Sequence, residues 1–285
     1  MNMQTITTKA LQREDLTLEE GMFLYTHASL SELMFIANEI RKTIRPNNIV
    51  TWIIDRNVNI TNVCVSRCTF CNFHTLIHKE DGYITQIEEY AQKIKELEAY
   101  GGNQLLIQGG MHPKLGIDFY VDLFTQLKKL FPHIKLHALG PPEVAYIAQR
   151  AHMSYADTLR TLQKAGLDSL PGAGAEILQN HIRKEISPGK CSADEWLAVM
   201  REAHKLNITT SATMMYGHVE TIEDRLQHLI ALRNLQSEKP HYSEGFTAFI
   251  PWPFYSKNTE LAKKHKKSFS IQHAEYVRMI AISRI

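Results

Sequence analysis

Residues 62–73 read Asn-Val-Cys-Val-Ser-Arg-Cys-Thr-Phe-Cys-Asn-Phe and carry three of the chain's four cysteines, Cys64, Cys68 and Cys71. Cysteine thiolates are the usual protein ligands of iron–sulfur clusters, and a cluster with four irons ordinarily takes four of them. The C-x3-C-x2-C spacing supplies three, so one iron would stay open to a ligand that is not protein. The stretch therefore indicates a metal-binding loop.

Zinc is the main alternative for this loop. Zinc sites usually have four ligands, and their motifs favour paired C-x2-C knuckles. No second knuckle follows, and the remaining Cys191 is remote. His74 and His78 could join Cys68 and Cys71, although a zinc finger leaves about 12–15 residues between its two pairs. Zinc, or no metal at all, stays open as the alternative to a cluster.

Length and composition place the chain among ordinary globular proteins. It has 285 residues, 44% hydrophobic and 22% charged, which allows a sizeable core. Its 32 Lys and Arg against 30 Asp and Glu give a net charge of +2, so neither a nucleic-acid nor a membrane partner is expected. No apolar run reaches transmembrane length, and residues 1–15 are too polar for a signal peptide. We therefore expect a cytoplasmic protein.

Strand and helix patterns alternate from residue 49 onwards, after two capped helices that begin at Thr17 and Ser29. Six strands are predicted, over 49–59, 104–108, 134–139, 167–170, 208–214 and 245–250. Such alternation implies parallel strands with right-handed crossovers, in a barrel or an open doubly wound sheet. We divide the chain into an N-terminal helical segment, 1–48, and an α/β domain, 49–285.

Candidate binding residues follow the predicted strands. Gln108-Gly109-Gly110 ends the second strand, and its glycines let the backbone approach a ligand closely. His137 lies on the third strand, and a histidine at a strand end can face the cavity and bind substrate or move a proton. The alternative is a buried histidine bonded to a backbone carbonyl. Glu176 follows a Gly-rich turn and suits hydrogen bonding to a ribose diol, with a place in the first turn of a helix as the alternative.

The cysteine loop, with Phe70 directly before its third cysteine, resembles the cluster loop of the radical S-adenosylmethionine (SAM) superfamily. The resemblance implies a [4Fe–4S] cluster on the three cysteines, with SAM bound to the open iron. It also implies a full or partial (β/α) barrel, similar to a TIM barrel. The site is then expected at the C-terminal ends of the strands.

The same resemblance implies contacts to SAM. In that superfamily a Gly-Gly segment binds the SAM amino group, which assigns residues 108–110 to that role. Met111 departs from the glutamate that often comes next. Glu176 is expected at the ribose, and Arg183 either pairs with the methionine carboxylate of SAM or is a plain surface charge.

Four blocks extend the resemblance beyond the superfamily. They are Leu-Pro-Gly-Ala-Gly-Ala-Glu-Ile-Leu from 170, Glu-Trp-Leu-Ala-Val-Met-Arg-Glu-Ala-His from 195, Ala-Thr-Met-Met-Tyr-Gly-His-Val-Glu-Thr from 212 and Phe-Ile-Pro-Trp-Pro-Phe from 249. They are similar to the radical SAM enzymes of the menaquinone (futalosine) pathway, with the deazaflavin cofactor synthases as close relatives. The last block favours the cyclic dehypoxanthine futalosine synthase branch.

This resemblance implies an oxidoreductase of menaquinone biosynthesis. A donor such as flavodoxin or ferredoxin would reduce the cluster, and cleavage of SAM would give a 5′-deoxyadenosyl radical. The radical would take a hydrogen from the ribose of dehypoxanthine futalosine, a nucleoside-like small molecule, and the carbon radical would close onto the aromatic ring. Trp252 and His137 are the catalytic candidates. The alternatives are an aminofutalosine synthase, a deazaflavin-type enzyme, or a non-enzymatic iron–sulfur or zinc-binding protein.

Six predicted strands are too few for a closed barrel, which needs eight. The final helical pattern, 271–285, has no glycine or asparagine to end it, and the related synthases continue further. We therefore expect an open, partial barrel from a C-terminally truncated chain.

Overall fold

Six parallel strands form one curled sheet in the order β1-β2-β3-β4-β5-β6. The structure, a computed structural model, describes residues 2–285. The strands are β1 (Asp55–Asn59), β2 (Gln104–Gln108), β3 (Lys135–Ala138), β4 (Ser169–Leu170), β5 (Thr209–Tyr216) and β6 (Phe246–Pro253). β1 pairs with β2 and β6 with β5, so the sheet is open between its first and last strands. The predicted open, partial (β/α) barrel is confirmed.

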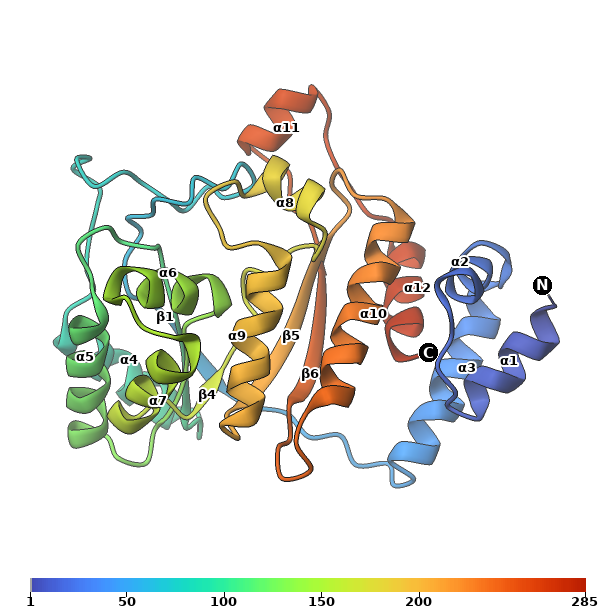
Figure 1. The fold of residues 1–285 in the computed structure, drawn as a ribbon, viewed down its shortest axis with the longest axis horizontal. Coiled ribbons are helices and arrows are strands. Elements are labelled where there is room, and N and C mark those ends of the chain that lie inside the picture. Colours follow the sequence, from blue (N-terminus) through green and yellow to red (C-terminus); the bar gives the residue numbers. More distant parts are fainter. Residues whose placement is uncertain (1) are drawn as a thin grey trace.

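Helices cover the outer face of the sheet (Figure 1). They are α4 (Ile87–Ala99), α5 (Ile117–Leu130), α6 (Pro141–Ala151), α7 (Tyr155–Ala165), α9 (Ala193–Lys205) and α10 (Ile222–Glu238). Buried side chains between sheet and helices form the main core, and Trp196, Phe124 and Tyr90 are among the largest. Two short helices, α8 (Asn180–Ile186) and α11 (Glu260–His265), lie at the C-terminal ends of the strands, at the top of Figure 1.

In the described part of the chain, from residue 2 onwards, three helices precede the sheet: α1 (Met3–Leu11), α2 (Leu18–His27) and α3 (Leu30–Ile44). Capping boxes at Thr17 and Ser29 begin α2 and α3, as predicted. The apolar sides of these helices form a second core with α12 (His273–Arg284) and the end of β5. None of the helices among residues 2–285 is long and apolar enough to cross a membrane.

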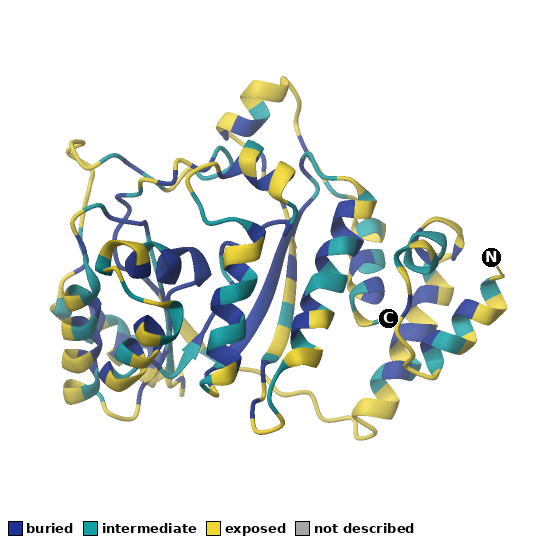
Figure 2. Cartoon of the chain, in the orientation of Figure 1, coloured by how far each residue is buried: buried dark blue, intermediate teal, exposed yellow. Residues whose placement is uncertain are grey.

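The first strand is shorter than predicted. Residues 49–54 are irregular, and the side chains of Val50 and Trp52 are 80% and 82% exposed. The prediction of a buried strand over 49–59 is therefore wrong for its first half. β2 begins opposite Asp55, so the chain upstream of Asp55 has no neighbouring strand to pair with. Figure 2 shows this connection as an exposed segment below the sheet.

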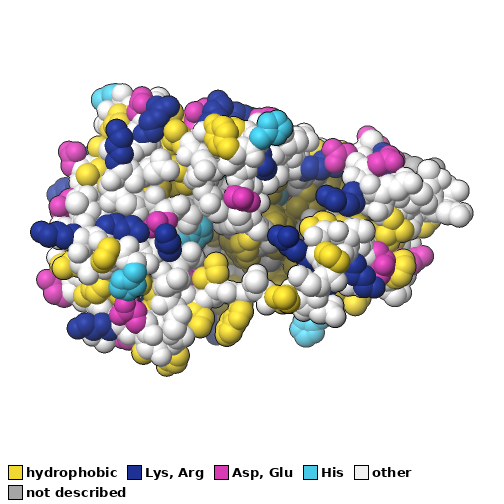
Figure 3. Space-filling view, turned by 90° about the horizontal axis from the view of Figure 1, so that it is seen from below, with side chains coloured by type: hydrophobic (Ala, Val, Ile, Leu, Met, Phe, Trp, Pro, Cys, Tyr) yellow, Lys and Arg dark blue, Asp and Glu magenta, His cyan; other side chains and the backbone are white. Residues whose placement is uncertain are grey.

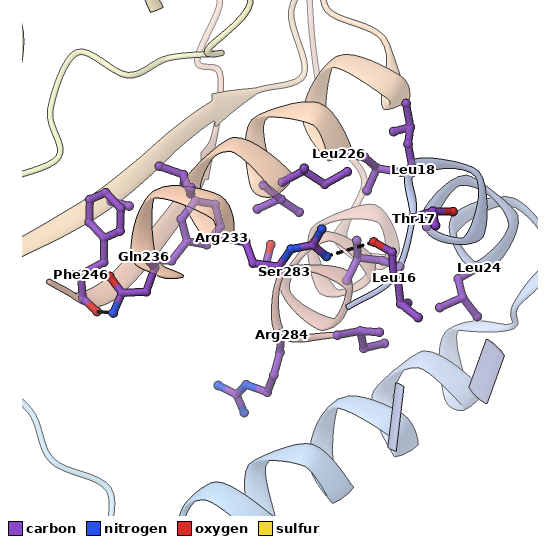
Figure 4. Close-up of a pocket in the computed structure, with 18 of the residues that line it drawn as sticks. Leu16, Thr17, Leu18, Leu24, Leu226, Arg233, Gln236, Phe246, Ser283 and Arg284 are labelled. Carbon is purple, nitrogen blue, oxygen red and sulfur yellow. Dashed lines mark hydrogen bonds between the residues drawn. The ribbon is translucent and has the colours of Figure 1, made fainter. Parts of the chain in front are cut away.

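An apolar cavity of about 400 Å³ lies where α2, α10, α12 and β6 meet. Figure 3 shows a hollow with an apolar floor between the sheet and the N-terminal helices, and Figure 4 shows side chains such as Leu226 and Phe246 that line the cavity. It lies beside the first half of β6, away from the C-terminal ends of the strands. No acidic or histidine side chain is among its described lining residues. The cavity therefore lacks the groups that acid–base or metal chemistry requires.

Candidate active site

The cysteine loop follows β1 and is held by backbone hydrogen bonds to segments far away in the sequence. These bonds join Cys64 to Thr75, Val65 to Met111, Thr69 to Ile186 and Leu261 to Thr69, with N···O distances of 2.8–3.1 Å. The loop after β2, the end of α8 and the start of α11 each supply a partner. These tertiary hydrogen bonds therefore fix the conformation of the cysteine loop.

Two glycines allow these segments to approach the cysteine loop. A Cβ atom on Gly110 would lie 2.2 Å from the carbonyl oxygen of Val63. One on Gly189 would lie 2.7 Å from the Cα of Ser66. Contacts this short exclude a side chain at either position. Gly110 is therefore required by the packing of the cysteine loop, whatever it contributes to a ligand.

The sulfurs of Cys64 and Cys68 lie beside hydrogen-bond donors. Ser66 Oγ lies 2.9 Å from Cys64 Sγ and 3.4 Å from Cys68 Sγ, so the two cysteines share one hydroxyl. The Met111 N–H also donates to Cys64 Sγ, at 3.3 Å. Hydrogen bonds to cysteine sulfurs tune the reduction potential of an iron–sulfur cluster. Three cysteines on one loop, with these donors, fit a cluster that keeps one iron open.

The zinc alternative receives no support from the histidines. His74 directs Nδ1 to the backbone oxygen of Cys71, 3.1 Å away. Within residues 2–285, no three His, Cys, Asp or Glu side chains come close enough together to hold a single ion. A cluster does not require such convergence, because each cysteine binds a different iron.

The Gly-Gly turn after β2 uses its own N–H groups within the protein. The Gly110 N–H donates to Thr61 O at 2.8 Å, and the Gly109 N–H donates to Glu143 Oε1 at 3.1 Å. Both N–H groups of the turn therefore already have an acceptor within the protein. Gln108 precedes the turn and directs its half-buried side chain to the concave face, opposite its buried neighbour Ile107.

A buried ion pair lies beside the cysteine loop. Lys190 Nζ is 2.5 Å from Glu176 Oε1, and their side chains are 17% and 4% exposed. The same Nζ lies 5.3 Å from the centre of the Phe70 ring. Burial alone would raise the pKa of Glu176, but Lys190, with smaller effects from Arg183 and His218, lowers the pKa below its ordinary value. The pair therefore brings an ammonium group and an ionised carboxylate to the loop that carries the cysteines.

The backbone at Glu176 is held in an unusual conformation. Its φ of 45° lies in the left-handed region, which costs about 1–2 kcal/mol for a residue other than glycine. Such strain tends to occur at functional sites. α8 begins at Asn180, so Glu176 does not lie in the first turn of a helix, and that alternative is wrong.

Arg183 is buried, and its guanidinium is bonded to backbone oxygens beside the ion pair. The residue is 3% exposed, and its guanidinium donates to backbone oxygens of Gly174, Ala175 and Cys191 at 2.6–3.0 Å. It is therefore not a surface charge. These bonds tie α8 to the Gly-rich turn and to the loop before α9. Lys190, one residue before Cys191, is the cation that the structure places beside Glu176 and Phe70.

Glu143 is a buried carboxyl group at the start of α6. It is 9% exposed and accepts from the Gly109 N–H. Burial raises the pKa of Glu143 to about 7, although Lys190 and backbone N–H groups oppose the shift. A carboxyl group with this pKa exchanges a proton near neutral pH, as a general acid or base must.

The stability of the protein should depend on pH through Glu143. Its pKa of about 7 in the fold exceeds the ordinary value of 4.5, so its contribution is full below pH 4.5 and is lost as the pH rises through 7. Relative to wild type, the free energy of unfolding of Glu143→Gln should therefore rise by on the order of 3 kcal/mol between pH 5 and pH 8, at 1.36 kcal/mol per pKa unit. Urea unfolding at both pH values measures this gain. An equal change in the exposed-site control Glu80→Gln would contradict the assignment.

His137 and Trp252 share the concave face of the sheet. Leu136 and Ala138 pack toward the helices, so His137 between them points to the opposite face. Its Nδ1 lies 2.7 Å from Ser169 Oγ, and burial lowers its pKa. Trp252 pairs in register with Met215. Met215 faces the concave side, because its neighbour Tyr216 packs against Arg225 of α10 on the outer side. The tryptophan is 36% exposed, as a side chain that lines an open barrel would be.

Glu143 and Lys190 are site residues that sequence reasoning missed. Glu143 stands five residues after the end of β3, and the rule that selected His137, a polar residue near the end of a strand, could have found it. Lys190 lies in the loop between α8 and α9 and does not follow a strand, so the same rule would not have found it. Only the contacts of that loop with Glu176 and Phe70 identify it.

The fold and the site together define a class of protein: a partial (β/α) barrel enzyme whose three-cysteine loop follows the first strand. The chain belongs to the radical SAM superfamily, whose family model matches residues 58–232. Residues 243–285 match the CofH/MqnC C-terminal region. The family implies a [4Fe–4S] cluster and SAM as cofactors.

Two groups of curated relatives match the chain. It is 40% identical over 269 residues to 5-amino-6-(D-ribitylamino)uracil–L-tyrosine 4-hydroxyphenyl transferase 2 of Methanosarcina mazei. The matched region covers 94% of this chain and 68% of that protein. It is 38% identical over 285 residues to cyclic dehypoxanthine futalosine synthase of Halalkalibacterium halodurans, which covers 100% of this chain and 75% of that protein. The predicted family is confirmed, and its relatives carry two different activities.

Solved structures resemble this fold. HydG, a maturase of the [FeFe]-hydrogenase, superposes with a TM-score of 0.72 at 18% identity, over 99% of this chain and 60% of that one. Methylornithine synthase (PylB) superposes with a TM-score of 0.69 at 16% identity, over 98% of this chain and 76% of that one. At these identities the likeness concerns the fold alone.

Proposed function

We propose that the chain is a radical SAM oxidoreductase that converts dehypoxanthine futalosine to cyclic dehypoxanthine futalosine in menaquinone biosynthesis. The observation that carries the proposal is the position of Trp252 on the concave face, paired with Met215. An aromatic wall there suits a reaction in which a ribose carbon must meet the substrate's own ring. The identity to the Halalkalibacterium halodurans synthase over the whole chain supports the same choice.

In this proposal Cys64, Cys68 and Cys71 hold the [4Fe–4S] cluster, and SAM binds its open iron. When bound, the cluster supplies the electron that cleaves SAM to methionine and a 5′-deoxyadenosyl radical. The remaining work is done by the chain's own residues, which position both substrates and exclude water from the concave face.

The ion pair beside the cysteine loop supplies matching groups for SAM. Lys190 would provide the cation for the methionine carboxylate, in place of Arg183, which is bonded to backbone oxygens. The Glu176 carboxylate would accept from the ribose hydroxyls, and the Phe70 ring would pack at the same place. The proposal thus keeps Glu176 at the ribose of SAM. It replaces Arg183 by Lys190 as the partner of the methionine carboxylate.

Ring closure needs a group that holds the substrate's aromatic ring. The ring radical formed on closure must then lose one electron, which would return to the oxidised cluster, and one proton, which a group of the chain must take. Productive contact requires the reacting atoms to be about 3–3.5 Å apart, and Trp252 would fold the substrate to that separation. His137 is the proton acceptor in this proposal, because burial lowers its pKa and keeps the imidazole neutral. It lies on the same concave face as Trp252.

Anaerobic turnover with dehypoxanthine futalosine and SAM, analysed by mass spectrometry, tests the proposal. The expected product is two hydrogens lighter than the substrate. The identity to the Methanosarcina mazei transferase supports a second candidate, a tyrosine 4-hydroxyphenyl transfer to a ribitylaminouracil. Adenosyl transfer to an enolpyruvyl substrate, as in aminofutalosine synthase, is a third. A product formed from either set of substrates instead would overturn the cyclic synthase assignment.

Replacing Trp252 by alanine should uncouple SAM cleavage from cyclisation. Aromatic contacts contribute about 0.5–1.5 kcal/mol beyond burial, so cyclised product per deoxyadenosine should fall by roughly up to tenfold. The cluster and SAM cleavage itself should persist. Tyr100→Ala, at an aromatic residue that is 78% exposed at the end of α4, is the matched control. A wild-type product ratio in Trp252→Ala would remove Trp252 from the site.

A further inference from the structure

We propose that an exposed lysine cluster beside the cysteine loop is the docking surface for an acidic electron-donor protein of the flavodoxin or ferredoxin kind. This inference rests on the proposed function, since a donor of this kind is needed only if the cysteines hold a cluster that must be reduced. It adds the place of contact on this chain and the chemistry that recognises the partner.

The lysine cluster is built by α11 and the residues on either side of it. Its members are exposed side chains: Lys257, Lys263, Lys264, Lys266 and Lys267. α11 ends at His265, and the next residue, Lys266, has a left-handed φ of 49° that turns the chain back on itself. Lysines from before, within and after the helix therefore line one shallow hollow of about 430 Å³.

The lysine cluster is joined directly to the cysteine loop. The Leu261 N–H of α11 donates to the backbone oxygen of Thr69, the residue after Cys68, at 2.8 Å. Asn72, the residue after Cys71, donates from Nδ2 to the backbone oxygen of Lys257 at 2.9 Å. A protein that docked on the cluster of lysines would therefore lie next to the segment that carries the metal ligands.

The surface charge here is positive and largely uncompensated. Lys264 and His265 pair with Glu185 of α8. The other four lysines form no ion pair within residues 2–285, and Glu260 is the nearby exposed acid on α11. Since the whole chain has a net charge of only +2, this is a local concentration of charge. Such a patch attracts an acidic partner and speeds association at low salt.

An electron donor fits this surface better than a nucleic acid or a membrane. Electron-transfer complexes are small, often below about 1,200 Å², and depend on charge complementarity. The partner would present an acidic surface, the complement of these lysines. Phe73, directly after Asn72, is 45% exposed and offers an uncharged contact within the basic surroundings. Docking beside the cysteine loop would bring an electron donor close to the cluster, whereas a nucleic acid or a lipid would gain nothing from this position.

The test compares two triple variants of the reconstituted holoenzyme. One carries Lys257→Gln, Lys263→Gln and Lys266→Gln, at lysines without an ion pair in the described chain. The control carries Lys95→Gln, Lys129→Gln and Lys164→Gln, at exposed lysines of α4, α5 and α7 that also form none there. Calorimetry measures the Kd for oxidised flavodoxin and, separately, for a [2Fe–2S] ferredoxin.

At low salt, where the Debye length exceeds about 10 Å, we expect the first variant to bind the donor at least about tenfold more weakly than wild type. The control should bind like wild type, and raising the salt concentration should abolish the difference. Equal donor affinity in the two triple variants would overturn the proposal. Tighter binding of single-stranded RNA or of anionic phosphatidylserine vesicles at the same lysines would overturn it as well.

A chemical reductant separates this inference from the proposed function. SAM cleavage driven by dithionite needs no docking, so it should proceed equally in wild type and in both triple variants. Cleavage driven by flavodoxin should slow in the first variant alone. If dithionite fails to drive SAM cleavage in wild type, the proposed function fails. If dithionite works and flavodoxin serves all three proteins equally, only the docking surface is wrong.

Discussion

Cys68→Ala protein, reconstituted anaerobically with iron and sulfide, is expected to hold no [4Fe–4S] cluster and to cleave no SAM. Cys68 is 4% exposed and shares the Ser66 hydroxyl with Cys64. Three cysteines are already one fewer than a four-iron cluster ordinarily takes, so a further loss leaves two irons without protein ligands. Bound iron, cluster absorbance and deoxyadenosine production measure the effect. Cys64→Ala and Cys71→Ala should behave in the same way.

Cys191→Ala is the matched control for this prediction. Cys191 is the one cysteine of the chain outside the cysteine loop, and its backbone oxygen, which the substitution retains, accepts from Arg183. The variant should keep both its iron and its SAM cleavage. Circular dichroism checks that every variant is folded. Unchanged iron content in Cys68→Ala would refute the assignment of the three ligands.

Lys190→Met is expected to lower the free energy of unfolding by about 3–5 kcal/mol, because it leaves Glu176 as an unpaired buried charge. Glu176 is 4% exposed on its side chain, and Lys190 Nζ lies 2.5 Å away. Without Lys190, the pKa of Glu176 should rise, since burial then acts with much less opposition. SAM binding should also weaken, because the substitution removes the proposed partner of the methionine carboxylate.

A double-mutant cycle separates these effects. Adding Glu176→Gln to Lys190→Met removes the unpaired charge, so the double variant should recover part of the lost stability. It should not recover SAM binding, which calorimetry measures. If Lys190→Met unfolds at the same urea concentration as wild type, the ion pair contributes nothing to the fold. Unchanged SAM affinity would instead remove Lys190 from the proposed site.

Local patterns in the sequence were enough for most of the architecture. β2 was predicted over its whole length, and α2 begins with the predicted capping box at Thr17. Periodicity and capping depend on residues within a few positions of one another, so they can be read from the chain directly. The same is true of the cysteine motif, whose three ligands lie within eight positions.

The tertiary structure was needed to identify those parts of the candidate site that depend on contacts between residues distant in sequence. Both Arg183 and Lys190 follow the Gly-rich turn, yet one is bonded to backbone oxygens and the other pairs with Glu176. The difference arises from the direction in which α8 and its following loop leave that turn. Glu143 likewise became a candidate only when burial raised its pKa and the Gly109 N–H was found to bond to it.

The sequence by itself determined the α/β class, the six parallel strands and the three cysteines of the proposed cluster, because each of these depends on short-range spacing. Only the tertiary structure decided that Val50 and Trp52 are exposed, because strand pairing depends on where the neighbouring strand begins. It also decided that Lys190 lies beside Glu176 and that the lysines of α11 lie beside the cysteine loop. Burial, pKa and the choice of partner are set by residues that are distant along the chain and adjacent in the fold.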